Sequence, residues 1–97
     1  MPAAYMIVDT KLTSATEYEE YKRLAKPILE DFGGEYLARG GTLYVDQDDL
    51  WTPNRLVIVK FPNMECAKEF LKSDRYKPVK ALRVRASHAT LALVEGL

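Results

Sequence analysis

The sequence predicts a single α+β domain over residues 1–97, in the order strand, helix, strand, strand, helix, strand. Three observations indicate this class. The length fits one domain. Short runs rich in β-branched and aromatic residues are typical of strands, and longer segments with apolar residues at helical spacing lie between them. A short connection joins the two central strands, which are therefore expected to pair antiparallel.

Residues 5–33 predict the first strand and the first helix. Tyr5–Leu12 begins with consecutive apolar residues, so both of its faces are expected to be covered. Ser14 and Glu17 have the spacing of a capping box, which predicts that a helix begins here. Pro27 is expected to kink or restart this helix, and Gly33 is expected to end it. The apolar stripe of the helix comprises Tyr18, Tyr21, Leu24, Ala25, Ile28, Leu29 and Phe32.

A short strand, Glu35–Arg39, follows between the glycine pairs Gly33–Gly34 and Gly40–Gly41. Alternation along a strand predicts two faces, with Tyr36 and Ala38 on one and Glu35, Leu37 and Arg39 on the other. The second glycine pair is expected to bend or bulge the strand, or to let another backbone come close. Arg39 therefore projects from a strand, beside glycines that leave room for a ligand.

The second half of the chain continues after a turn-rich connection. Thr42–Val45 is expected to stay extended, and Asp46–Asn54 carries residues typical of turns. Arg55–Phe61 predicts the next strand. The remaining elements are a helix capped by Asn63 with Cys66, Ala67, Phe70 and Leu71 on its inner face, a short helical piece over Asp74–Val84, and a strand over Ser87–Glu95.

This order of elements is that of a ferredoxin-like βαββαβ fold. Right-handed crossovers place the helices on one face of a four-stranded antiparallel sheet. Apolar side chains nevertheless load both faces of three strands, in Met6–Val8, Leu56–Val59 and Leu91–Val94. Because no further segment remains to cover the second face, we expect a homodimer that pairs through the sheet faces.

The composition narrows the class of partner. Fourteen basic and fourteen acidic residues cancel, whereas general binders of nucleic acids or membrane surfaces usually carry a basic excess, so neither partner is expected. The one cysteine, Cys66, and the lack of an apolar run near the ~20 residues of a membrane span predict a cytoplasmic protein. No cofactor or metal is predicted, because the sequence holds no zinc spacing, Walker loop or dinucleotide fingerprint.

The chain resembles the domain-of-unknown-function 1330 family in two segments and three single residues. The segments are Tyr36–Gly41 and Leu93–Leu97, and the single residues are Trp51, Tyr76 and Arg83. The resemblance runs essentially from end to end and implies a dimeric α+β barrel, in which two ferredoxin-like sheets pack face to face. It implies no particular reaction, because the wider group includes cofactor-independent monooxygenases, haem-degrading enzymes, small isomerases and binding modules. The haem-degrading type relies on a helical histidine, whereas the one histidine here opens the last strand.

Arginines are the leading candidates for binding an anion, because a guanidinium offers a planar fork to a carboxylate. Arg39 is the first of them; the alternative is a structural salt bridge with Glu35 or Glu95, or a cross-strand pair. Arg83 lies in the basic stretch from residue 72 to residue 85 and belongs to the family pattern, although a solvated helix face explains most of that stretch.

Aromatic residues supply the other candidates. Tyr44, Trp51 and Arg55 could wall an apolar pocket at the loop; alternatively, Trp51 anchors the loop to the body or to a second copy. Tyr21 and Tyr76 could offer hydroxyls to a pocket between helices and sheet, although aromatic stripes at helical spacing are more often core.

These candidates predict a protein that binds a small organic anion or aromatic between its helices and its sheet. The alternative is a cofactor-independent monooxygenase or isomerase that acts on a similar molecule. The lack of a metal motif favours binding, and His88, the one histidine, has no partner identifiable as part of a catalytic pair. The cluster of Arg39, tyrosines and Trp51 keeps the enzymatic alternative open.

Overall fold

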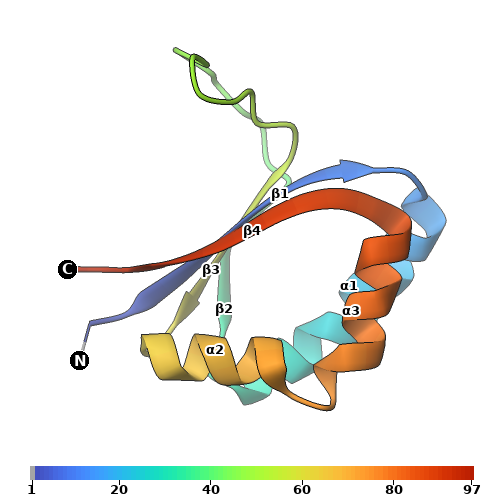
Figure 1. The fold of residues 1–97 in the computed structure, drawn as a ribbon, viewed down its shortest axis with the longest axis vertical. Coiled ribbons are helices and arrows are strands. Elements are labelled where there is room, and N and C mark those ends of the chain that lie inside the picture. The colour runs from blue at the N-terminus through green and yellow to red at the C-terminus, as the bar shows by residue number, and fades with distance from the viewer. Residues whose placement is uncertain (1) are drawn as a thin grey trace.

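The computed structural model describes residues 2–97 and has the predicted order of elements (Figure 1). The strands are β1 (Ala4–Leu12), β2 (Glu35–Arg39), β3 (Leu56–Phe61) and β4 (Ser87–Glu95). The helices are α1 (Ala15–Asp31), α2 (Met64–Lys72) and α3 (Tyr76–Ala86). Residues 42–45, which were expected to be extended, belong to no strand. We call the connection over residues 41–54 the arm.

The four strands form one antiparallel sheet in the order β2-β3-β1-β4. At its centre Ile7 of β1 lies opposite Ile58 of β3 on one side and Ala92 of β4 on the other. This is the ferredoxin-like topology that the sequence predicts. Figure 1 shows the three helices on one side of the sheet and the arm rising from the other side.

Local chemistry explains where α1 begins and ends. The Ser14 hydroxyl accepts a hydrogen bond from the Glu17 amide at 3.3 Å, which is one half of the predicted capping box. The other half is absent from the described residues, because the Ser14 amide donates to the Ala86 carbonyl at 3.1 Å. Gly33 adopts a φ of +83° just after the helix, and its amide donates to the Glu30 carbonyl at 2.9 Å. The expected restart at Pro27 is wrong, because α1 continues through it as one helix. Buried neighbours of Pro27 on the inner stripe hold this part of the helix against the core, which outweighs one missing hydrogen bond.

The core lies between the helices and one face of the sheet. Val59 and Phe61 of β3 are fully buried there, as are Phe70 of α2 and Tyr76 of α3. The rings of Phe70 and Tyr76 pack with their centroids 4.3 Å apart. Tyr76 therefore sits deep in the core, and its polar hydroxyl needs a partner inside the protein.

A bulge in β2 overturns the predicted division of its faces. Tyr36 pairs with Val59 and Ala38 pairs with Ile58, so Leu37 is an extra residue in the strand. The register then places Arg39 opposite Val57, which points toward the helices. Arg39 therefore shares the helix-covered face with Tyr36, and Ala38 lies on the other face. Alternation alone could not predict this, since the bulge exists only in the pairing with β3.

The sheet face away from the helices stays partly exposed. Along β1 the side chains alternate between buried and half-buried from Ala4 to Thr10, and the half-buried ones, Tyr5, Ile7 and Asp9, lie on this face. Val94 of β4 is 50% exposed there. We call this surface the open face; its apolar residues are Tyr5, Ile7, Ala38, Leu56, Ile58, Ala92 and Val94. The predicted apolar load on both faces of the strands is confirmed, and helices cover only one of the two.

Candidate functional site

A small cavity lies between α1, α3 and the helix-covered face of the sheet, and we call it the helix–sheet cavity. Its volume is about 20 Å³, room for about one or two water molecules. Aliphatic and thioether side chains from β1, β3 and α1 form one wall: Met6, Val8, Leu29 and Val57. The rest of the lining is aromatic or basic: Tyr18, Tyr21, Lys22, Tyr36, Arg39 and Arg83. Three of the ten lining residues are cations and none is acidic.

Two tyrosine hydroxyls meet beside this cavity. The hydroxyl oxygen of Tyr21 on α1 lies 2.9 Å from that of Tyr76 on α3. Burial and the neighbouring Tyr76 phenol raise the pKa of Tyr21 far above its ordinary value of 10.0, although the nearby Arg83 charge opposes the shift. Tyr21 therefore keeps its proton at neutral pH and forms hydrogen bonds as a neutral phenol.

Arg83 of α3 is a buried cation, 8% exposed, on the wall of the cavity. Its Nε–H group is buried and donates to no protein acceptor among residues 2–97. Arg83 also forms no ion pair within this described part of the chain. Burying a charged donor without an acceptor costs on the order of 1–3 kcal/mol or more. The guanidinium is thus placed for an acceptor that these protein groups do not supply.

Arg39 reaches the mouth of the same cavity because of the bulge in β2. Its guanidinium carbon lies 4.7 Å from the ring centroid of Tyr36, within the range of a cation–π contact. Within the described residues Arg39 forms no salt bridge, with Glu35, Glu95 or any other acid. Burial raises the pKa of Tyr36, and the charge of Arg39 opposes that shift. At the rim, the Lys22 ammonium pairs with Glu19 at 2.7 Å.

Arg55 does not line the cavity but contacts Tyr18, one of its lining residues. Its guanidinium carbon lies 5.1 Å from the ring centroid of Tyr18, and its Nη1 donates to the Tyr18 hydroxyl at 3.4 Å. Gly40 permits this position, because a Cβ there would stand 2.8 Å from the Arg55 Nε. Gly40 therefore makes room for a side chain, whereas the sequence predicted that the second glycine pair would bend or bulge the strand or admit another backbone.

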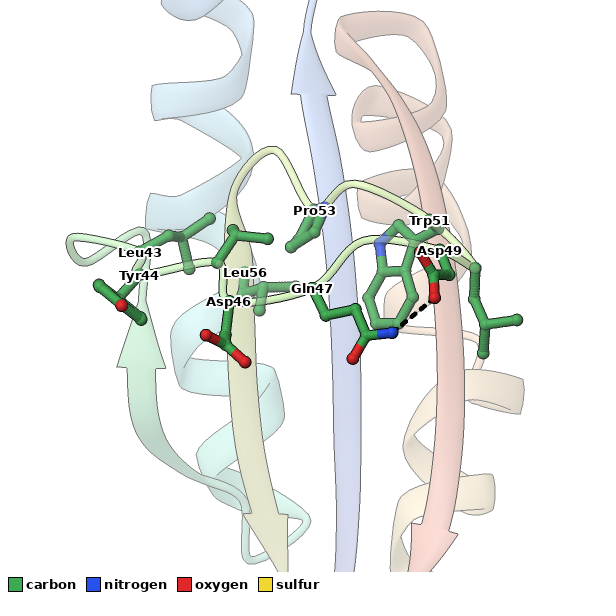
Figure 2. A pocket seen from close by; sticks show the side chains of 10 residues that line it. Leu43, Tyr44, Asp46, Gln47, Asp49, Trp51, Pro53 and Leu56 are labelled. Carbon is green, nitrogen blue, oxygen red and sulfur yellow. Dashed lines mark hydrogen bonds between the residues drawn. The ribbon is translucent and has the colours of Figure 1, made fainter.

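Tyr44 and Trp51 lie elsewhere, on the arm at the opposite side of the sheet. Figure 2 shows them around a separate, open pocket of about 640 Å³, with Leu43, Asp46, Gln47, Asp49, Pro53 and Leu56 also labelled. Tyr44 is 91% exposed, and Leu50, another residue of this lining, is 95% exposed. The arm thus presents large apolar side chains to solvent and does not border the helix–sheet cavity.

Asp9 of β1 anchors the base of the arm, a role that the sequence reasoning missed. Its carboxylate accepts hydrogen bonds from the Trp51 indole at 2.8 Å and from the amides of Asn54 and Arg55 at 2.9 and 3.1 Å. Burial opposes ionisation of Asp9, but these bonds outweigh it and hold the pKa of the carboxyl below its ordinary 3.8. The available clue was an acid placed directly after the apolar run of the first strand.

The structure therefore divides the sequence candidates into two groups. Tyr21, Arg39 and Arg83 line one cavity, and Tyr76 and Arg55 contact its lining. Tyr44, Trp51 and the exposed His88 lie outside it. Residues 2–97 contain no group of three His, Cys, Asp or Glu side chains placed to hold a metal ion. In the same range, no helix is both long enough and apolar enough to span a bilayer.

The comparison of sequences gives a family and no activity. Residues 3–97 match the family described as a domain of unknown function, DUF1330. No curated protein matches the chain.

Solved structures share the fold at low sequence identity. A protein of unknown function from Rhodopseudomonas palustris is 18% identical, with a TM-score of 0.77 over 99% of this chain and 83% of that chain. SnoaB, a cofactor-independent oxygenase from Streptomyces nogalater, is 13% identical, with a TM-score of 0.70 over 100% and 95%. A dimeric ferredoxin-like protein of unknown function from Jannaschia sp. CCS1 is 11% identical, with a TM-score of 0.65 over 97% and 99%. These likenesses establish the ferredoxin-like fold.

Proposed function

This chain belongs to the domain-of-unknown-function 1330 family, and because membership brings no reaction with it, we propose a function from the residues of the helix–sheet cavity. The protein binds a small organic anion, aliphatic or aromatic, between its helices and its sheet. The cavity is the place where Tyr21, Arg39 and Arg83 come together.

The observation that carries this proposal is the charge of the lining. Three cations and no acid line the cavity, and of the cations only Lys22 has a carboxylate partner in the described part of the chain. Surfaces of one sign attract ligands of the other, and guanidinium groups bind carboxylates through paired hydrogen bonds. The aliphatic wall and the tyrosine rings suit the apolar part of an organic anion.

A second candidate is a cofactor-independent oxygenase or isomerase, which the shared fold of SnoaB and the phenols of the cavity favour. Reactions that begin by removing a proton need a base close to the substrate. The ten lining residues include no carboxylate and no imidazole, and the raised pKa of Tyr21 keeps that phenol protonated. The lining therefore supports binding better than catalysis.

Replacement of Arg39 tests this function. Arg39→Ala should change the melting temperature by less than about 3 °C, because the side chain is exposed and forms no ion pair in the described residues. The same variant should lose the stabilisation that small carboxylates such as butyrate, succinate and benzoate give in a thermal-shift assay. Arg23→Ala removes an exposed arginine of α1 that pairs with Glu20, and it should keep that stabilisation. A large fall in melting temperature for Arg39→Ala, with no ligand shift in the unmodified protein, would assign Arg39 a structural role.

We also propose that two copies pair through the open face. Half-buried or exposed apolar residues, including Ile7, Ile58 and Val94, lie together there, and contiguous apolar surface on a small protein marks an interaction site. The arm rises from the same side and carries the exposed Tyr44 and Leu50. The Jannaschia protein of the same fold is described as dimeric. A second copy on this side would cover the open face and the arm together.

A further inference from the structure

Two hydrogen-bond donors at the helix–sheet cavity lack an acceptor. The first is the buried Nε–H of Arg83. The second belongs to the phenol pair: Tyr21 and Tyr76 share one hydrogen bond, and when Tyr76 donates it, the hydroxyl of Tyr21, which lines the cavity, keeps a hydrogen with no acceptor among residues 2–97. An ionised carboxylate accepts hydrogen bonds and brings no donor of its own. It therefore complements this end of the cavity better than an alcohol or an amide.

The size of the cavity limits what fits beside these donors. About 20 Å³ holds a group as large as about one or two waters. A planar carboxylate has that size and leaves its substituent directed to the mouth. Phosphate and sulfate are tetrahedral and bulkier in every direction. The space thus favours the carboxylate head of a larger molecule.

A second guanidinium, that of Arg39, has no carboxylate partner among residues 2–97 and lies at the mouth of the same cavity. Lys22, the other cation of the rim, is already paired with Glu19. A carboxylate at Arg83 balances one of the two unpaired charges and leaves the charge of Arg39. Because both arginines line one small cavity, a ligand with two anionic groups a short distance apart would balance both charges.

We propose that the ligand is a short dicarboxylate. One carboxylate accepts from the Arg83 Nε–H and from the free hydroxyl of the Tyr21–Tyr76 pair, and the other lies against Arg39 at the mouth. The few carbons between them lie against the tyrosine rings and the aliphatic wall. This inference rests on the proposed function, since it specifies the ligand of the same cavity.

Calorimetric titration of the full chain with matched acids tests the proposal. Succinate and butyrate have the same number of carbons and differ in the second carboxylate; we expect succinate to bind at least about tenfold more tightly. Malonate, glutarate and inorganic phosphate complete the series, and phosphate should bind more weakly than the best dicarboxylate. Arg39→Ala should remove the succinate advantage, so that succinate and butyrate bind this variant equally weakly. Arg75→Gln, at an exposed arginine of the surface, should change neither affinity.

A separate set of measurements tests the inner site, at which a carboxylate would accept from the Arg83 Nε–H. In the unmodified protein, the ¹⁵N and ¹H resonances of the Arg83 Nε–H should shift on addition of either succinate or butyrate. Arg83→Gln should abolish binding of both acids, and Tyr21→Phe should weaken both, which serves as the second variant should Arg83→Gln fail to fold.

The outcomes separate this inference from the proposed function. Equal affinities for succinate and butyrate, together with weaker binding in Arg39→Ala, would overturn the dicarboxylate and leave anion binding intact. Phosphate binding tighter than any dicarboxylate would also overturn it. No binding of any anion, with no shift at Arg83, would overturn both.

Discussion

At the residue scale, the position of the Tyr21 hydroxyl governs its protonation. Burial and the neighbouring phenol make its anion unfavourable, so its pKa lies above the ordinary 10.0 in the folded protein. The unfolded chain has no such environment. The folded phenol therefore holds its proton more tightly than the unfolded one. This difference stabilises the fold fully below pH 10 and is lost as the pH rises through the raised native pKa.

Tyr21→Phe should therefore reduce the fall in the free energy of unfolding that occurs at alkaline pH. We expect the free energy of unfolding of the unmodified protein to fall between about pH 9 and about pH 11, and that of the variant to fall less. At neutral pH the variant should be less stable by about 1 kcal/mol, because the Tyr76 hydroxyl loses its partner. Urea unfolding at each pH measures both effects. Tyr44→Phe, which removes an exposed hydroxyl, should leave the pH profile as it is; an unchanged slope in Tyr21→Phe would contradict the account.

At the element scale, the arm depends on one carboxylate of the neighbouring strand. Asp9 accepts the three hydrogen bonds that tie Trp51, Asn54 and Arg55 to β1. The rest of the arm lies over the open face as irregular chain (Figure 2). The end of the arm is therefore held by a residue, Asp9, that lies more than thirty positions before the arm begins.

Asp9→Asn should loosen the arm and leave the sheet intact. The neutral amide accepts hydrogen bonds less strongly than a carboxylate, so Trp51 should become more exposed to water. Since the chain has one tryptophan, its fluorescence should shift to longer wavelength, with the far-ultraviolet circular dichroism unchanged. Asp46→Asn, within the arm, is the matched control and should not change the emission. An unshifted emission in Asp9→Asn would show that other contacts hold Trp51.

Acid should release the arm in the same way. The lowered native pKa of Asp9 means that its stabilising effect is present above pH 3.8 and is lost as the pH falls below it, through the native pKa. The red shift of Trp51 emission in the unmodified protein should therefore begin only below pH 3.8. In Asp9→Asn the emission should already be shifted at neutral pH and should respond little to acid.

The sequence could predict the elements because the chemistry that starts and ends them is local. Ser14 and Asn63 cap helices as expected, and the apolar stripes identify the inner faces. The site depends on contacts that are distant in sequence. Helical spacing places Tyr21 and Tyr76 inward, but the meeting of their hydroxyls joins residues 55 positions apart. Asp9 acts on an amide 45 positions away, which no local pattern indicates.

At the scale of the whole molecule, the two faces of the sheet differ in what covers them. The helix-covered face holds the core, whereas no helix of the described residues covers the open face, which is apolar. A dimer that pairs through the open face would bury the apolar side chains that the helices leave exposed. Light scattering after size exclusion should then give twice the 11.0 kDa of the chain. A monomer at micromolar concentration would contradict this assembly.

Two neighbouring residues of β3 distinguish assembly from folding. Ile58→Asp places a charge on the open face, so we expect a folded monomer. Val59→Asp places a charge in the core, where Val59 is fully buried, so we expect loss of the fold. Circular dichroism and light scattering on both variants check this pair. An Ile58→Asp protein that stays dimeric would exclude pairing through the open face.

The bulge at Leu37 has a consequence for how the lining of the helix–sheet cavity can change in evolution. The guanidinium of Arg39 reaches the helix–sheet cavity because β2 is one residue longer than the pairing with β3 requires. A β2 of the same length that paired with β3 without the bulge would return to plain alternation and turn the same arginine to the open face. Homologous chains can therefore keep the arginine and lose the pocket cation. Deletion of the bulged Leu37 would instead keep Tyr36 and Arg39 together on the helix-covered face, so a one-residue gap at this position would leave the pocket cation in place.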